Sequence, residues 1–201
     1  MQKPDFTNDS ASAAAPARIF APDPSKPRPA VIALIGLPGA GKSTIASALV
    51  EQLGMRRVCR DAIRAAMFPQ CSYSFAEKRA AFRALLLALE INCLLGESSV
   101  IDGMTFSRRR DLVRVDSAIR KYGFLPIPIY LDCSVETARA RITQQLALQP
   151  ELARERTPEL AAEVRARFDT PPPNALMVNA NLPLEEVSRV VIAAVTQLLA
   201  P

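Results

Sequence analysis

The chain of 201 residues contains no histidine, and this absence narrows the chemistry open to it. Without an imidazole it cannot build a Ser-His-Asp or Cys-His arrangement, in which histidine takes the proton of the nucleophile. Carboxylates are therefore the side chains that we expect to act as general bases.

Cysteine is scarce and widely spaced. The chain has four, none of them in a Cys-x-x-Cys pair: Cys59, Cys71, Cys93 and Cys133. This spacing fits neither a zinc site nor a dense disulfide framework, and it favours a reducing compartment. A chain of this length can bury a core without such crosslinks.

Long hydrophobic runs are missing as well. No segment reaches the roughly 18 apolar residues of a membrane-spanning helix, and the alanines at 11–15 do not form the apolar stretch of a signal peptide. We expect a cytoplasmic protein without membrane contact. The net charge of +5 suits an anionic ligand such as a nucleotide, and it supports a nucleic acid partner only weakly.

Composition divides the chain near residue 30. Residues 1–29 hold six prolines and few large apolar side chains, which predicts a flexible tail. Residues 30–35 form a continuous apolar run, typical of a strand buried on both faces. Strands and helices alternate after it, so residues 30–201 are expected to form one α/β domain, a three-layer sandwich with a five-stranded parallel sheet.

The other elements follow from periodicity and end signals. Strands are expected at 57–59, 99–101, 127–131 and 176–178, although Pro128 is awkward in a strand because it cannot donate to the ladder. Helices are expected at 43–53, 75–95, 107–122, 135–148, 158–168 and 184–199, with a capping box at 74–77 and Thr157 as the N-cap of the helix at 158. The apolar residues of the helix at 75–95 predict core packing.

A glycine-rich segment between the first strand and helix matches GxxxxGK[ST]. It consists of Gly36, Leu37, Pro38, Gly39, Ala40, Gly41, Lys42 and Ser43, and Thr44 follows. Glycines let successive N–H groups turn toward phosphate oxygens at the positive end of the helix. Lys42 is then expected at the β- and γ-phosphates of ATP, and Ser43 at Mg²⁺. A plain Gly-Pro turn would not require the strand before it and the helix after it, which are both present.

Two acids stand at expected strand ends. Asp102 follows an apolar strand, where the second acid of a phosphate-loop site would hold a metal-bound water; the alternative is an acidic cap or turn residue. Asp61 and Arg64 lie three apart on one face of an expected helix. Asp61 could take the proton of an acceptor hydroxyl while Arg64 binds a phosphate; the alternative is an N-cap aspartate with a surface ion pair worth tenths of a kcal/mol.

The run at 108–110 consists of three arginines at the start of an expected helix, where cations oppose the helix dipole. It either faces an anionic ligand or forms a solvated turn whose charge Asp111 offsets.

Together these motifs resemble the kinases related to phage polynucleotide 5′-kinase, a group that includes zeta-toxin-like kinases and bacterial AAA-domain proteins. Besides the phosphate loop, the resemblance rests on Arg60-Asp61-Ala62-Ile63-Arg64, on the segment 101–109, and on Tyr130-Leu131-Asp132 followed by 135–141. It extends from about residue 31 to 178.

The resemblance implies roles for individual residues. Asp61 would be the general base, Arg64 would bind the acceptor phosphate, and Arg141 would act on the transferring group from a lid at about 141–158. This sequence departs from the family in having Gly103 and Met104 where Thr-Asn is usual. It also has Gln145 where a second lid arginine is common; either of two later arginines, at 154 and 156, could substitute.

The expected function is ATP-dependent transfer of the γ-phosphoryl group to a hydroxyl, on a polynucleotide 5′ end or on a small metabolite. The acceptor is left open. Two alternatives remain: a nucleotide-dependent switch or ATPase without an acceptor, and a nucleotide-binding scaffold without catalysis. The intact loop and the acids Asp61 and Asp102 argue against the scaffold.

Overall fold

The computed structural model describes residues 28–149 and 157–200. Most of the expected tail and the arginines at 154 and 156 lie outside them. Five parallel strands form one sheet in the order β2-β3-β1-β4-β5. They are β1 (Ala30–Ile35), β2 (Arg56–Cys59), β3 (Ser99–Asp102), β4 (Leu125–Asp132) and β5 (Leu176–Asn179). The helices are α1 (Lys42–Leu53), α2 (Arg60–Met67), α3 (Phe75–Leu94), α4 (Arg109–Arg120), α5 (Val135–Leu148), α6 (Leu160–Ala166) and α7 (Leu184–Leu199).

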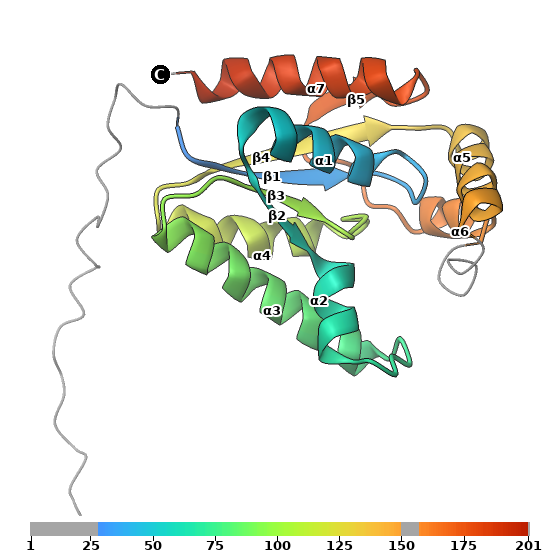
Figure 1. Ribbon diagram of the computed structural model, residues 1–201, viewed down its shortest axis with the longest axis horizontal. Coiled ribbons are helices and arrows are strands. Elements are labelled where there is room, and N and C mark those ends of the chain that lie inside the picture. Colours follow the sequence, from blue (N-terminus) through green and yellow to red (C-terminus); the bar gives the residue numbers. More distant parts are fainter. Residues whose placement is uncertain (1–27, 150–156, 201) are drawn as a thin grey trace, which may run out of the picture.

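The expected three-layer α/β sandwich is confirmed. Figure 1 shows α1 and α7 above the sheet and α3 and α4 below it. Because side chains alternate along a strand, β1 contributes to both cores: Ile32 and Leu34 pack toward α1 and α7, and Val31 and Ile35 toward α3 and α4. Every residue of β1 is buried, as its apolar run predicts.

The carboxyl ends of all five strands lie at one edge of the sheet, because every pair of neighbouring strands is parallel. The register sets Cys59 of β2 beside Asp102 of β3, and β1 ends at Ile35 between β3 and β4. In Figure 1 the strand arrows point toward this edge, where α5 and α6 also lie. Ligands of open α/β sheets bind outside the carboxyl ends of the strands.

The prolines of β4 are compatible with a central strand because of where β5 begins. Leu125 donates to the Pro29 carbonyl at 2.9 Å, so alternate residues of β4 direct their N–H groups toward β1. Pro126 and Pro128 therefore face the other side, and β5 pairs with β4 only from Ile129 onward. Their missing N–H groups cost no ladder hydrogen bond.

One expected helix start is wrong. Thr157 does not cap α6: its carbonyl accepts a hydrogen bond from the Leu160 N–H at 3.1 Å, and the helix begins at Leu160 with Glu159 at the N-cap position. The tight turn over Pro158 and Glu159 therefore precedes the helix. Helix α4 is also shorter at both ends than the expected 107–122.

The four cysteines are unpaired. No helix within residues 28–149 and 157–200 is long and apolar enough to cross a membrane.

The capping box of α3 is confirmed. Ser74 Oγ accepts from the Glu77 N–H at 3.3 Å, and the Glu77 carboxylate accepts from the N–H groups of Ser72 at 3.1 Å and Ser74 at 2.9 Å. Hydrogen bonds from Ser72 and then Ser74 outweigh desolvation and lower the pKa of Glu77 from 4.5 to about 2. The ionised carboxylate thus fastens the chain that enters α3.

We expect Glu77→Gln to lower the melting temperature at pH 7. Because folding lowers the pKa of Glu77, the stabilisation is fully present above about pH 4.5 and is lost as the pH falls through about 2. The gap in melting temperature between wild type and variant should therefore close over this interval. Glu51→Gln, on an exposed position of α1, is the control; a gap that is constant from pH 7 to pH 2 would contradict the role of the charge.

Candidate active site

The glycine loop joins β1 to the amino end of α1 and is packed from two sides. Gly39 and Gly41 have φ angles of +83° and +94°, which favour glycine. A Cβ at Gly39 would collide with the Ala138 carbonyl oxygen of α5, and one at Gly41 with the Leu184 side chain of α7. The loop therefore needs glycine for its backbone shape and for its close contacts.

The amino end of α1 has no side-chain cap, and its first turn contains no acid. The N–H groups at such a helix end carry the positive end of the helix dipole, which favours an anion. Lys42, the first residue of α1, donates from Nζ to the carbonyls of Gly36 at 3.0 Å and Leu37 at 2.7 Å. A lysine beside a glycine loop at the amino end of a helix suits a phosphate group.

Asp102 is a buried carboxylate held by three parts of the site. Its Oδ1 accepts from Ser43 Oγ of α1 at 3.0 Å, and its Oδ2 from Arg57 of β2, through Nε at 3.1 Å and through a second guanidinium nitrogen. Burial raises the pKa of Asp102, but hydrogen bonds from Arg57, the Gly103 N–H and Ser43 outweigh it and hold the pKa below its usual range. Asp102 is thus ionised at neutral pH, not a solvated turn residue.

Ser43 and Asp102 are suitable donors for Mg²⁺. A hydroxyl and a carboxylate are hard oxygen ligands, and Mg²⁺ usually takes only one or two from the protein, the others being phosphate and water oxygens. No cluster of three or more acids, cysteines or histidines that could hold a metal occurs in the described part of the chain. The pair therefore fits a magnesium ion that arrives with a nucleotide.

Asp61 lies next to this pair and does not cap its helix. Helix α2 begins at Arg60 with Cys59 at the N-cap position, so the expected alternative of an N-cap aspartate is wrong. Asp61 Oδ1 accepts from Arg64 at 3.0 Å and from Arg60 at 3.3 Å. Arg64 is only 5% exposed, and its guanidinium lies 4.5 Å from the centre of the Tyr73 ring.

Gly103 explains how Asp61 reaches the end of β3. Its φ is +71°, and a Cβ there would lie 2.8 Å from the Asp61 nitrogen and 3.1 Å from Asp61 Cγ and Oδ2. The Asp61 carboxyl group therefore packs directly against the residue that follows Asp102. A β-branched residue in place of Gly103 would exclude Asp61 from this position.

Arg141 makes contacts that the sequence did not suggest. From α5 it donates to the carbonyls of Ala180 at 2.8 Å and Leu182 at 2.7 Å, and so joins the expected lid to the segment that follows β5. Gln145, in the position of the second lid arginine, is partly exposed on the same helix.

Asp169 and Arg57 are residues of this edge that the sequence analysis missed. Asp169 accepts from the Arg109 N–H at 2.9 Å and from Arg108 at 3.0 Å. These two bonds, the backbone one first, lower the pKa of Asp169. Arg108 and the Arg109 N–H thus receive their acid from about 60 residues away, where no local pattern signals it, whereas Arg110 pairs with the neighbouring Asp111 at 4.0 Å, as the alternative expected. Arg57 could have been suspected as a charged residue in the strand beside β3.

The family model described as AAA domain matches residues 31–171. The chain belongs to the AAA domain family. No curated protein matches it significantly. The narrower likeness to polynucleotide 5′-kinases and zeta-toxin-like kinases stays a prediction.

Solved structures share the fold at low sequence identity. The chain is similar to a gluconokinase from Sinorhizobium meliloti, with 17% identity, a TM-score of 0.66, and coverage of 87% of this chain and 95% of that one. It is also similar to a sugar kinase from Janibacter sp., with 17% identity, a TM-score of 0.64, and coverage of 86% of this chain and 96% of that one. For the APS kinase of Mycobacterium tuberculosis the identity is 16% and the TM-score 0.63, with coverage of 85% of this chain and 99% of that one.

We expect Gly103→Ala to destabilise the protein more than Gly123→Ala. Both glycines have a left-handed φ, but nothing lies within 4 Å of a Cβ at Gly123, whereas one at Gly103 meets Asp61. Both variants therefore lose stability because alanine disfavours a left-handed φ. Overpacking against Asp61 should lower the free energy of unfolding of Gly103→Ala by about 1 kcal/mol or more beyond that loss. Urea unfolding of both variants measures it; equal losses would show that Asp61 does not pack against Gly103.

Proposed function

We propose that the chain is an ATP-dependent kinase that transfers the γ-phosphoryl group to an acceptor hydroxyl. The observation that carries this proposal is the packing of Asp61 against Gly103, one residue from the Asp102–Ser43 pair. A phosphate-binding loop with a metal-ligand pair and a second, separate carboxylate then share one edge of the sheet.

On the donor side, the N–H groups of the loop and Lys42 would hold the β- and γ-phosphates. Lys42 would exchange its two loop carbonyls for phosphate oxygens. Ser43 and Asp102 would hold Mg²⁺, which when bound neutralises charge on the phosphates. Arg57 keeps Asp102 ionised and oriented for this task. Catalysis on this side would consist of positioning and charge stabilisation.

On the acceptor side, Asp61 would accept the proton of the attacking hydroxyl. About a third of its side chain is exposed, so a substrate can reach it. Arg64 would bind a phosphate of the acceptor. Because Arg64 is buried between Asp61 and the Tyr73 ring, it would also orient the Asp61 carboxylate. Kinetics with acceptors that carry or lack a phosphate would separate phosphate binding from this orienting role.

The kinase domain would comprise residues 30–201, with a lid at about 141–158. For Arg141 to reach the transferring group, it must exchange the Ala180 and Leu182 carbonyls for phosphate oxygens. Two hydrogen bonds to neutral carbonyls are replaced by charge-assisted ones, which are stronger. Closure on ATP would supply this exchange.

A small metabolite suits this frame better than a polynucleotide 5′ end. The structural neighbours are named as a gluconokinase, a sugar kinase and an APS kinase, and the net charge of +5 is modest for a nucleic acid partner. The first experiment is a screen of the purified protein with labelled ATP against sugars, nucleotides and oligonucleotide 5′ ends. ATP hydrolysis without labelled product from any acceptor would favour the switch or ATPase.

Lys42→Ala should lower phosphoryl transfer by about 10²-fold or more, because a cation aimed at the developing charge is lost. Lys78→Ala, an exposed lysine on α3, is the control and should keep full activity. Transfer is measured with labelled ATP, and circular dichroism checks the fold. Turnover of Lys42→Ala equal to that of wild type would refute the kinase assignment.

Asp61→Asn should lower transfer by about 10²-fold or more while ATP binding, measured by calorimetry, stays near wild type. The amide keeps the shape of the carboxylate but cannot take a proton. Asp116→Asn, on the surface of α4, should be silent. Arg64→Ala should raise KM more for a phosphate-bearing acceptor than for a neutral one. Weakened ATP binding with normal transfer at saturating ATP would instead assign Asp61 and Arg64 to the donor side.

A further inference from the structure

Helix α3 is apolar on two opposite faces. One face packs on the sheet through residues such as Phe82, Leu85 and Leu89, which are buried. The opposite face carries small and large apolar residues spaced three and four apart, here called the α3 stripe: Ala76, Ala80, Ala84, Leu87, Ile91, Leu94 and Leu95. A helix of a globular protein that is apolar all round is normally covered on both sides.

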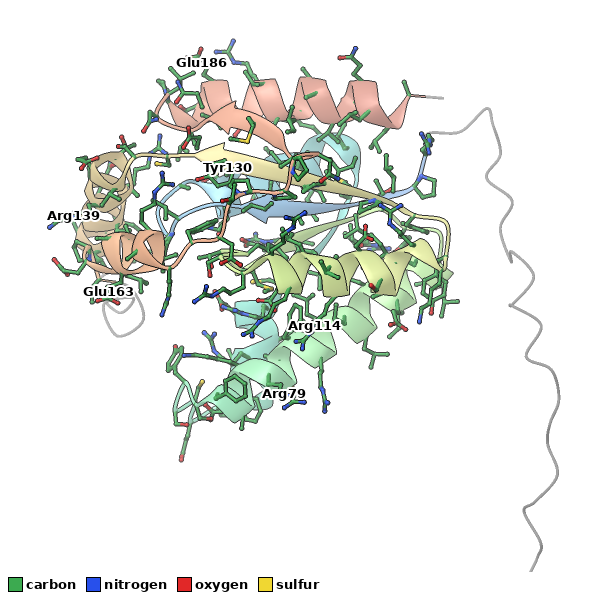
Figure 2. All side chains as sticks on the ribbon, turned by 180° about the vertical axis from the view of Figure 1, so that it is seen from behind. Arg79, Arg114, Tyr130, Arg139, Glu163 and Glu186 are labelled. Atoms are coloured by element: carbon green, nitrogen blue, oxygen red, sulfur yellow. The ribbon has the colours of Figure 1, made fainter. Side chains whose placement is uncertain are left out.

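The large residues of the α3 stripe face outward, and Ala80 and Ala84 are partly exposed. Leu87 is 60% exposed, Leu95 65%, Ile91 48% and Leu94 45%. Figure 1 shows α3 along the lower edge of the molecule, and Figure 2 shows Arg79 pointing away from the same helix. Leu94, expected in the core from its periodicity, belongs to this outer face. A contiguous apolar surface of this kind marks an interaction site.

We propose that the α3 stripe binds the α3 stripe of a second copy, antiparallel about a twofold axis near Leu86 and Leu87. The first argument is size. The stripe is small in its amino-terminal half and large in its carboxyl-terminal half, so an antiparallel pairing sets the alanines of one helix against the leucines and isoleucine of the other. Ala84 then packs between Leu87 and Ile91 of the second copy, a knob-and-hole contact of the kind that close helix packing uses.

The second argument is charge. Arg83 and Glu90 border the same side of the stripe and lie equally far on either side of the proposed axis. The register that packs Ala84 between Leu87 and Ile91 therefore brings Arg83 of each copy level with Glu90 of the other. Arg83 is exposed, and Glu90 uses only Oε2 for Lys121 and Tyr122. A parallel twofold pairing would instead place the two copies of Arg83, and likewise the two copies of Glu90, on opposite sides of the stripe, so that Arg83 and Glu90 would not meet.

The stripe can form the centre of a dimer interface. Over its 20 residues α3 spans about 30 Å and is about 10 Å wide, so the flanking residues would have to supply the rest of a standard interface of about 800 Å² per partner. The charges that flank the stripe have both signs, which an anionic membrane surface would not select. The twofold arrangement satisfies the apolar face and both flanking charges at once.

Sedimentation velocity tests the assembly. Wild type should dimerise, and Ile91→Lys should raise the dissociation constant at least about 30-fold, because it places a charge at the centre of the apolar contact. Val190→Lys is the matched control: Val190 of α7 is 48% exposed, as Ile91 is, and the variant should dimerise like wild type. Circular dichroism spectra of the two lysine variants that match the wild type show that the fold is intact; the melting temperature is not used, because loss of the dimer by itself lowers it.

Disulfide trapping tests the register. Leu87→Cys, beside the proposed axis, should give an oxidised dimer, and Leu95→Cys should not, because the axis separates the two copies of Leu95. The wild type, with its four native cysteines, sets the background. Trapping through Leu95→Cys but not Leu87→Cys would overturn the antiparallel register.

Two other results would also overturn the proposal. One is a wild type that stays monomeric at a protein concentration of about 100 µM, at which even a weak dimer would be populated. The other is a dimer that Ile91→Lys leaves unchanged. If wild type is monomeric and deletion of residues 1–27 increases dye binding to exposed apolar surface, the occupant of the stripe is the amino-terminal segment and not a second copy.

Discussion

The site depends on one buried carboxylate. Asp102 is 3% exposed, and a buried charge is tolerated only where hydrogen bonds and an opposite charge replace the water it has lost. Ser43 and Arg57 supply these, and they come from α1 and β2. The carboxylate therefore joins the phosphate loop, the central sheet and the strand that leads into α2. Removing Arg57 would leave the buried carboxylate without its opposite charge, and removing Ser43 would take away one of its hydrogen bonds.

Two glycines allow close contacts that bring α5 and Asp61 to the same edge of the sheet. Gly39 lets α5 approach the loop, and Gly103 lets Asp61 approach the end of β3. Asp169 then ties the chain after α6 to the amino end of α4, where it offsets the helix dipole and Arg108.

The elements that were predicted well are those with strong local signals. The apolar run of β1, the capping box at Ser74 and the glycine after α1 each depend on neighbours within a few residues. Two features did not follow from the local pattern, one decided by a distant strand and one by a local turn. Pro128 is acceptable only because β5 begins pairing at Ile129, and the turn at Thr157 is closed by its own short hydrogen bond and not by a side-chain cap.

The sequence by itself determined the phosphate loop, the order of strands and helices, and the presence of acids at strand ends, because these depend on local spacing. Only the tertiary structure decided that Asp61 packs on Gly103, that Arg141 donates to carbonyls of the chain after β5, and that Asp169 binds Arg108 and the Arg109 N–H. Periodicity shows that α3 has apolar faces, but it does not tell which one the sheet covers. Contacts between residues far apart in the chain carry no signal in the spacing of either partner.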